Sequence, residues 1–185
     1  MANNQKTNET SMTCLKILAA GAIFSMDTLT PNAAGPILKM FEKHGVKNKQ
    51  KIIQSIKYLE RRGLVITKKI GKTTYAEITE DGKKRIKKYD FNNMKIEKPK
   101  TWDKKWRIVC FDVPETKKKG RDSLRLKLKE LNFLPLQKSV WLHPYPCANE
   151  INFISEVFQI SPYVWLMEAA KIDREKYIKN HFNLV

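Results

Sequence analysis

Residues 47–63 read KNKQKIIQSIKYLERRG, and this stretch decides the fold of the N-terminal half of the chain. Its apolar residues recur at helical spacing and predict one buried stripe, made of Ile52, Ile53, Ile56 and Leu59. Gly63 is a typical C-terminal stop, so we expect a helix over residues 48–62. A shorter helix is predicted to begin at Pro36 and to end before the turn at Gly45. Two helices joined by a short glycine-containing turn predict a helix-turn-helix.

The neighbouring segments extend this pattern in both directions. Residues 10–26 predict a first buried helix, which follows a polar, disordered N-terminus over residues 1–9. Residues 64–79 are rich in Val, Ile, Thr and Tyr and predict two β-strands that form a hairpin. Thr79 and the acidic residues after it are expected to cap a further, basic helix. The order helix, helix, helix, hairpin predicts a winged helix-turn-helix domain over residues 10–89.

The second half of the chain has a different pattern. Residues 90–101 have no apolar period and predict a linker. Apolar runs then alternate with helical segments: a strand over 106–113, a helix over 117–132, a strand or strand pair over 136–145, a helix over 148–158 and a strand over 163–170. Asp173 is expected to cap a terminal helix. This alternation predicts a ferredoxin-like α/β sandwich over residues 102–185, so the fold class of the chain is α+β.

The charge of the chain indicates a polyanionic partner. The net charge is +17, which is more than solubility requires. Residues 47–90 hold 14 Lys and Arg against 5 Asp and Glu, whereas residues 131–185 hold 5 against 5. Between Lys47 and Arg62 only Glu60 is acidic, although a merely solvated helix face would mix both signs. We therefore expect the N-terminal domain to bind double-stranded DNA.

Helical geometry turns the polar side chains of residues 48–62 away from the apolar stripe. Amide and basic groups can pair with base edges in the major groove, so we assign possible base reading to Asn48, Gln50, Lys51, Gln54 and Ser55. The outward face also presents Lys47 and Tyr58. Contacts with the DNA backbone are expected from Lys57, Arg61 and Arg62. The tip of the hairpin would contact phosphates or an adjacent minor groove through Lys68, Lys69 and Lys72.

Cysteine, histidine and apolar patterns exclude several classes of protein. The cysteines are odd in number and widely spaced, which predicts reduced thiols at Cys14, Cys110 and Cys147. The histidines are scattered without metal-ligand spacing, so we expect no zinc. The apolar run over residues 15–24 is interrupted by Lys16 and is too short to span a bilayer. These patterns predict a cytoplasmic protein with no membrane partner.

The second half of the chain resembles a known family. Its segments WDKKWRIVCFDVPE (102–115), RDSLRLKLKELNF (121–133) and LQKSVWLHPYP (136–146) are similar to the central domain of PaaX-type transcriptional repressors. The region also resembles the small ferredoxin-like CRISPR-associated adaptation nuclease, most specifically at residues 111–114 and 137–141. With the preceding winged helix and linker, the order of domains agrees with the PaaX family over nearly the whole chain.

The resemblance implies a homodimer that presents two winged helices to a palindromic or repeated operator and represses transcription. The family has a further C-terminal domain, which we expect to be absent because this chain ends at Val185. An effector ligand is therefore left unassigned. In the nucleases, the aspartate matching Asp112 is linked to a metal site between two protomers. Two copies of Asp112 at a two-fold axis could hold Mg²⁺, although an aspartate at a strand end is also a common cap or turn residue.

Two functions are thus weighed against each other. The leading hypothesis is a non-enzymatic, sequence-specific DNA-binding regulator without a cofactor, because no nucleophile, base and orienting group occur as a set. The alternative is a Mg²⁺-dependent nuclease or CRISPR-adaptation-like protein that uses Asp112. A membrane-surface protein is disfavoured, because no strongly amphipathic helix combines the charge with exposed bulky apolar residues. Core or dimer packing, rather than base stacking, is expected for Trp102, Trp106, Trp141 and Trp165.

Overall fold

The computed structural model describes the backbone of residues 2–21, 24–25 and 35–184, and the side chains of residues 9–21 and 39–184. The chain forms two compact units, Met1–Asn92 and Asn93–Val185. Each unit has its own sheet, and both contain helices, so the fold is of mixed α+β type. None of the helices in these residues is long and apolar enough to cross a membrane.

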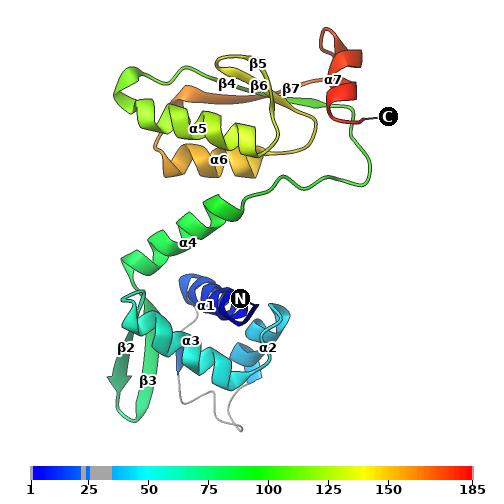
Figure 1. Ribbon diagram of the computed structural model, residues 1–185. Helices are drawn as coiled ribbons and strands as arrows, with labels where there is room; N and C mark the ends of the chain where they lie inside the picture. Colours follow the sequence, from blue (N-terminus) through cyan, green and yellow to red (C-terminus); the bar gives the residue numbers. More distant parts are fainter. Residues whose placement is uncertain (1, 22–23, 26–34, 185) are drawn as a thin grey trace. The chain divides into compact units, whose positions relative to one another are not determined.

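The N-terminal unit combines helices with a small antiparallel sheet (Figure 1). Its elements in chain order are α1 (Ala2–Ala19), β1 (Phe24–Ser25), α2 (Gly35–Lys43), α3 (Lys49–Arg61), β2 (Val65–Ile70), β3 (Thr73–Ile78) and α4 (Glu80–Asn93). The strand order is β1-β3-β2, and the hairpin of β2 and β3 pairs Val65 with Ile78 and Ile70 with Thr73. The predicted helices and hairpin are therefore present, with an additional short strand beside β3.

Two boundaries of this unit differ from the prediction. Helix α1 begins at Ala2, so the expectation of a disordered segment over residues 1–9 is wrong for residues 2–9, and Met1 lies outside the described residues. No proline or glycine interrupts residues 2–19, and polar residues are tolerated where a helix faces solvent. The helix ends at Ala19, and Gly21 follows with a φ of 82°, a left-handed conformation that suits glycine. Helix α4 continues to Asn93, so the extended linker begins at Met94 rather than at residue 90.

The core of the N-terminal unit joins α1 to α3. The predicted stripe is confirmed at Ile52, Ile56 and Leu59, which are buried, while Ile53 is partly buried at its edge. These side chains pack with residues of α1, α2 and the sheet: Met12, Cys14, Leu15, Ile17, Leu18, Phe41, Val65 and Ala76. Burial of α3 along one side only leaves its opposite side in solvent, where the candidate DNA-contacting residues are found.

The second unit is a four-stranded antiparallel sheet with helices between its strands (Figure 1). Its elements are β4 (Trp106–Phe111), α5 (Lys118–Glu130), β5 (Leu134–Gln137), β6 (Val140–His143), α6 (Ala148–Val157), β7 (Val164–Ala169) and α7 (Glu175–His181). The sheet has the order β5-β6-β4-β7. A β-α-β-β-α-β chain order is compatible with the predicted ferredoxin-like arrangement. The segment 136–145 is resolved as parts of two paired strands, β5 and β6, rather than one.

The two faces of this sheet are covered differently. Helices α5 and α6 lie against one face, and Ile178 of α7 packs against Trp106 and Leu142 at one end of the other. Core packing, one of the two roles expected for the tryptophans, is confirmed for Trp106 and Trp141, which are buried, whereas Trp165 is 55% exposed and is left to the other, dimer packing. The predicted cap of α7 is wrong by one residue. The cap position belongs to Arg174, with a φ of 58°, and its side chain forms no capping hydrogen bond.

Candidate nucleic-acid interface

Asn48 caps the N-terminus of helix α3. The Asn48 side chain accepts a hydrogen bond from the backbone N–H of Lys51 at 3.2 Å, which satisfies one of the free donors at the start of the helix. The amide oxygen of Asn48 is therefore engaged, and only its NH₂ group is left to pair with a base edge. Lys47 precedes the cap and is exposed.

The solvent side of α3 gathers the most coherent part of the predicted interface. Gln50, Gln54, Lys57 and Arg61 are all exposed and recur at intervals of three and four residues, so they lie along one side of the helix. The Arg61 side chain donates to the backbone carbonyl of Lys57 at 3.3 Å. Within the described residues, no acidic side chain is paired with Lys57 or Arg61. This side therefore combines two amides with two unneutralised cations.

Ser55 does not belong to that side. It is only 3% exposed and lies among the buried residues of α3, so the assignment of Ser55 to base reading is wrong. One position in a helix turns the side chain by about 100°, so residues three or four positions apart share a side, and Ser55 therefore lies on the buried side with Ile52 and Leu59. The Ser55 side chain is small, so it fits into the core although it is polar.

Three further predicted residues lie along a flank of α3 that is close to α1. Tyr58 and Arg62 line a cavity together with residues of α1, and the Arg62 guanidinium lies over the Tyr58 ring at 5.5 Å. Lys51 lines another concavity with Glu9, Thr10 and Thr13 of α1. All three are exposed, but they are separated from the row of Gln50, Gln54, Lys57 and Arg61. The structure thus divides the predicted set into a solvent row and a flank.

The predicted lysines of the hairpin differ in whether an acidic side chain pairs with them. Lys68 forms an ion pair with Glu77 of the neighbouring strand at 2.6 Å, so part of its charge is already neutralised. Lys69 and Lys72 are exposed, and in the residues with described side chains neither has an acidic partner. The base of the hairpin is tied to α3, because the Thr67 hydroxyl donates to the Glu60 carboxylate. This contact also engages the single acid of α3.

The start of α4 is fixed against the end of α3. Thr79, the predicted cap, donates its hydroxyl to the carbonyl of Gly63 at 2.7 Å and accepts from the N–H of Gly82 at 3.1 Å. The two acids of the first turn are paired with lysines, Glu80 with Lys83 and Asp81 with Lys84. These pairs lower the pKa of the Glu80 carboxyl, chiefly through the Lys83 hydrogen bond. The remaining cations of α4 are exposed at Arg85, Lys87 and Lys88.

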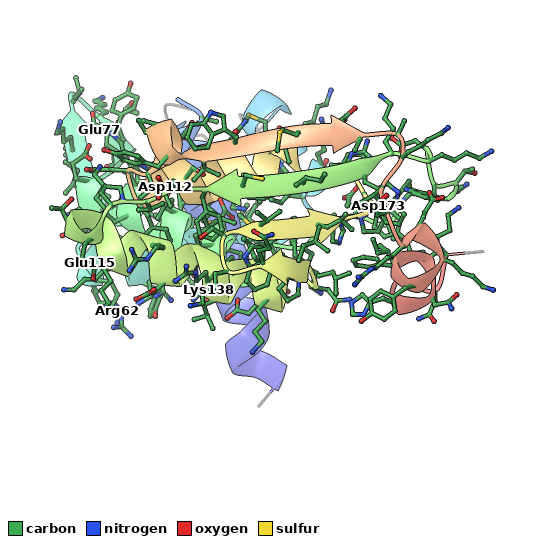
Figure 2. The ribbon with its side chains drawn as sticks, turned by 90° about the horizontal axis from the view of Figure 1, so that it is seen from above. Arg62, Glu77, Asp112, Glu115, Lys138 and Asp173 are labelled. Carbon is green, nitrogen blue, oxygen red and sulfur yellow. The ribbon has the colours of Figure 1, made fainter. Side chains whose placement is uncertain are left out.

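Asp112, the candidate metal ligand, lies just beyond the end of β4 (Figure 2). Its backbone N–H donates to Tyr163, and its side chain is exposed. The nearby acids are held by arginines: Glu115 contacts Arg121 at 2.8 Å, and Asp122 contacts Arg125 at 3.6 Å. No group of three potential ligands occurs in the part of the chain that is described. One protomer therefore offers Mg²⁺ a single free carboxylate, which is a poor fit for a metal site.

The other reactive side chains are held in their neutral forms. Burial raises the pKa of Cys14 to about 12, and burial together with Glu150 raises that of Cys147 to about 12. Burial also lowers the pKa of His143 to about 4, and its Nδ1 accepts from the N–H of Tyr145 at 3.2 Å. A buried thiol is a weak nucleophile and a neutral, enclosed imidazole is a weak proton donor. All three cysteines are free thiols, as predicted.

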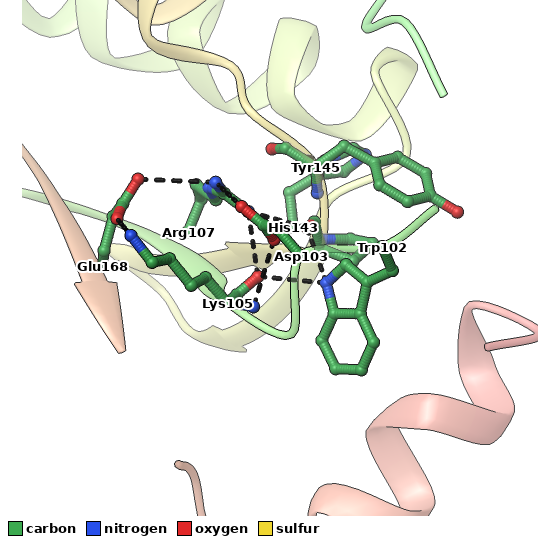
Figure 3. A network of polar contacts seen from close by, with 8 residues as sticks. Trp102, Asp103, Lys105, Arg107, His143, Tyr145 and Glu168 are labelled. Atoms are coloured by element: carbon green, nitrogen blue, oxygen red, sulfur yellow. Dashed lines mark hydrogen bonds and ion pairs between the residues drawn. The ribbon is translucent and has the colours of Figure 1, made fainter. Parts of the chain in front are cut away.

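A polar network around the buried Arg107 in the second unit was not anticipated from the sequence (Figure 3). Arg107 on β4 is buried, and it donates to Asp103 at 2.7 Å and to the carbonyl of Pro144 at 3.1 Å. Trp102 donates to that same carbonyl at 2.9 Å, while Glu168 pairs with Arg107 at 3.4 Å. Arg107 holds the pKa of the Asp103 carboxyl below its usual range. The network joins the entry to β4 with β7 and the loop after β6, which is a structural role.

Comparison with known proteins gives a match within the second unit. No curated protein matches the chain. Residues 99–179 match the family model of the PaaX protein central Cas2-like domain, and this range covers nearly all of the sheet unit from β4 to the middle of α7. The resemblance of the segments within residues 102–146 to this domain is thereby confirmed. Residues 99–179 therefore form a PaaX-type central Cas2-like domain.

Proposed function

We propose that the chain is a sequence-specific, double-stranded DNA-binding transcriptional repressor that acts as a homodimer. Its PaaX-type domain is typical of transcriptional regulators in general. The observation that supports DNA binding best is the solvent side of α3, where Gln50 and Gln54 are followed by Lys57 and Arg61, two cations without an acidic partner among the described side chains. In a winged helix the second helix of the helix-turn-helix enters the major groove. Here that helix is α3, and the hairpin of β2 and β3 is the wing.

The amide and the basic side chains of α3 would have different roles in DNA binding. Gln50 and Gln54 are near the N-terminal half of the helix, and an amide can pair in a bidentate manner with adenine. Lys57 and Arg61 lie further along and would neutralise phosphates, which increases affinity for every sequence equally. Lys69 and Lys72 of the wing would add further contacts with phosphates. Specificity is thus expected from the amides and salt dependence from the cations.

The proposal is tested with duplexes selected from a random pool and measured by fluorescence anisotropy. Neutralisation of about six to eight phosphates predicts a log–log salt slope of roughly −5 to −7. Gln54→Ala should relax the preference at one base pair by about 1–3 kcal/mol. Arg61→Ala should weaken all duplexes and reduce the slope by about one. Lys176→Ala in α7, an exposed cation of the second unit, is the matched control and should bind like the unchanged protein.

Two results would contradict this function. A salt response close to zero would show that the basic face does not meet phosphates. Cleavage of DNA or RNA that requires both Mg²⁺ and Asp112, and that EDTA or Asp112→Ala abolishes, would favour the nuclease alternative instead. Against that alternative, the two acids that follow Asp112 in the sequence, Glu115 and Asp122, are paired with Arg121 and Arg125.

A further inference from the structure

A cavity of about 240 Å³ lies inside the N-terminal unit, where α1, the end of α3 and α4 come together. Its floor is apolar and includes Met12, Leu15 and Leu59, all of which are buried in the core of the unit. Its rim is polar and includes Arg62 and Arg85. A concave site with an apolar wall and a few convergent polar groups is the usual form of a small-ligand pocket, although this one is somewhat below the common size range.

Two guanidinium groups meet this cavity from different elements. Arg62 follows the last turn of α3 and stacks over the Tyr58 ring, which also lines the cavity. Arg85 comes from the second turn of α4. Among the described ion pairs, neither arginine has an acidic partner, since Glu80 and Asp81 are engaged by lysines. Two like charges at one concavity favour occupancy by an anion.

A hydroxyl without a partner lies at the same place. Ser11 is 3% exposed and lines the cavity from α1. Within the described part of the chain its Oγ has no hydrogen-bond partner. A buried polar atom that lacks a partner is costly, so such atoms are normally satisfied. An oxygen of a bound ligand would accept the hydrogen bond that the Ser11 hydroxyl is free to donate.

We propose that this cavity binds a small carboxylate with a short apolar group. The planar fork of a guanidinium matches the two oxygens of a carboxylate, so Arg62 and Arg85 would hold the charged end. The Ser11 and Tyr58 hydroxyls would add hydrogen bonds, and the apolar floor would take up the hydrocarbon part. A phosphodiester backbone has no apolar end to fill such a floor, which distinguishes this ligand class from DNA.

The site also links ligand binding to DNA binding, a consequence that rests on the proposed function. Tyr58 and Arg62 line the cavity and also belong to the predicted DNA-contacting set. A carboxylate that holds the Arg62 guanidinium removes a cation from the DNA-facing helix. Coupling between two sites is reciprocal, so bound DNA would lower the affinity of the cavity for the carboxylate by the same factor. The ligand would act as an inducer that lowers affinity for the operator.

The binding step is tested on the full chain without DNA, so that its outcome does not depend on the proposed function. Isothermal titration with hexanoate and with benzoate should give saturable binding with a Kd in the millimolar range or tighter. Hexanol and acetate, which lack the charge or the apolar group, should bind much more weakly. Arg85→Gln should weaken hexanoate and benzoate about tenfold. Lys87→Gln is the matched control, since it removes an exposed charge from the same helix outside the cavity.

Two outcomes would overturn the site. One is that neither hexanoate nor benzoate binds to a folded protein, as judged by circular dichroism. The other is that Arg85→Gln and Lys87→Gln weaken binding equally, which would indicate a general charge effect. A separate titration of the selected DNA should show weaker binding in saturating hexanoate. If the unchanged protein binds no DNA, the proposed function fails while the cavity result stands.

Discussion

His143 shows how burial alone changes the chemistry of one residue. It is 5% exposed at the end of β6, with the rings of Phe133 and Tyr145 at 4.8 and 5.4 Å between centroids. Burial lowers its pKa to about 4, and the charge of Arg107 acts in the same direction. The imidazole is therefore neutral in the folded protein at any pH above that value.

This burial predicts a loss of stability in weak acid. The unfolded chain binds a proton at His143 near the ordinary pKa of 6.5, while the folded chain does so only near 4, so stability falls as the pH drops from about 6.5 to 4. Between pH 7 and pH 5 the loss from this group is about 2 kcal/mol. Urea unfolding followed by tryptophan fluorescence measures it, because all four tryptophans lie in the second unit.

A matched pair of variants isolates the contribution of His143. His143→Gln should flatten the pH dependence between pH 7 and pH 5, whatever its effect on absolute stability. His181→Gln alters an exposed histidine of α7 and should retain the full dependence. Equal slopes in both variants would show that His143 is not the group that titrates.

Gly82 is required because neighbouring atoms leave no room for a side chain at this position, and not because the chain turns there. A Cβ atom at this position would lie 2.3 Å from the carbonyl oxygen of Leu64 and 2.6 Å from Cγ1 of Ile78. An alanine in a helix normally stabilises it by about 1 kcal/mol relative to glycine. Gly82→Ala should nevertheless destabilise the N-terminal unit by about 1–3 kcal/mol, because the backbone of Leu64 has to move. Thermal denaturation should place its melting temperature below that of Lys84→Ala, an exposed control in α4; a rise would refute the clash.

At the scale of elements, the lysines of the hairpin of β2 and β3, the proposed wing, are not equivalent. Lys68 is paired across the hairpin with Glu77, whereas Lys69 and Lys72 have no acidic partner in the described side chains. We therefore expect Lys72→Ala to weaken DNA binding by more than Lys68→Ala does. Glu77→Gln should strengthen binding several-fold, since it removes a repulsive charge and releases Lys68.

The measurement for the wing is anisotropy on one selected duplex at two salt concentrations. Glu156→Gln removes an exposed acid from α6 of the second unit and serves as the control for net charge. If Glu77→Gln and Glu156→Gln strengthen binding equally, the gain reflects total charge. If Lys68→Ala and Lys72→Ala are equivalent, the ion pair seen at Lys68 does not persist near DNA.

At the scale of the whole molecule, the sheet of the second unit leaves apolar side chains uncovered. Trp165 and Met167 on β7 are 55% and 47% exposed, and they lie opposite Cys110 and Ile108 of β4. This places them on the face that α5 and α6 do not cover, toward the viewer in Figure 2. Exposed apolar groups that cluster on one face are typical of an association surface, and we expect the proposed homodimer to form through this face.

Substitution on the two sides of the sheet tests that expectation. Trp165→Lys should shift the protein to a monomer in sedimentation experiments, because it places a charge in an apolar interface. Leu126→Lys changes an equally prominent residue, 61% exposed on α5, and should leave the dimer intact. A dimer that persists in Trp165→Lys but dissociates in Leu126→Lys would show that the interface is on the side of the helices. If the protein without substitutions is a monomer, the proposed dimer interface does not exist.

Periodicity in the sequence by itself determined most helices and strands of this protein and the buried stripe of Ile52, Ile56 and Leu59. These features are local, since they depend on side-chain spacing along one segment. Only the tertiary structure showed that Ser55 is buried, because two neighbouring helix positions differ by about 100° and the width of the core decides which is covered.

Contacts between distant segments likewise required the fold. The cavity brings Ser11, Arg62 and Arg85 together from three helices, and the network of Arg107 joins Asp103 to Glu168. No spacing rule relates positions so far apart in the chain. The basic helix from Asn48 to Arg62 was thus recognisable from its sequence, but its division into a row that faces solvent and a flank beside α1 follows from what packs against it.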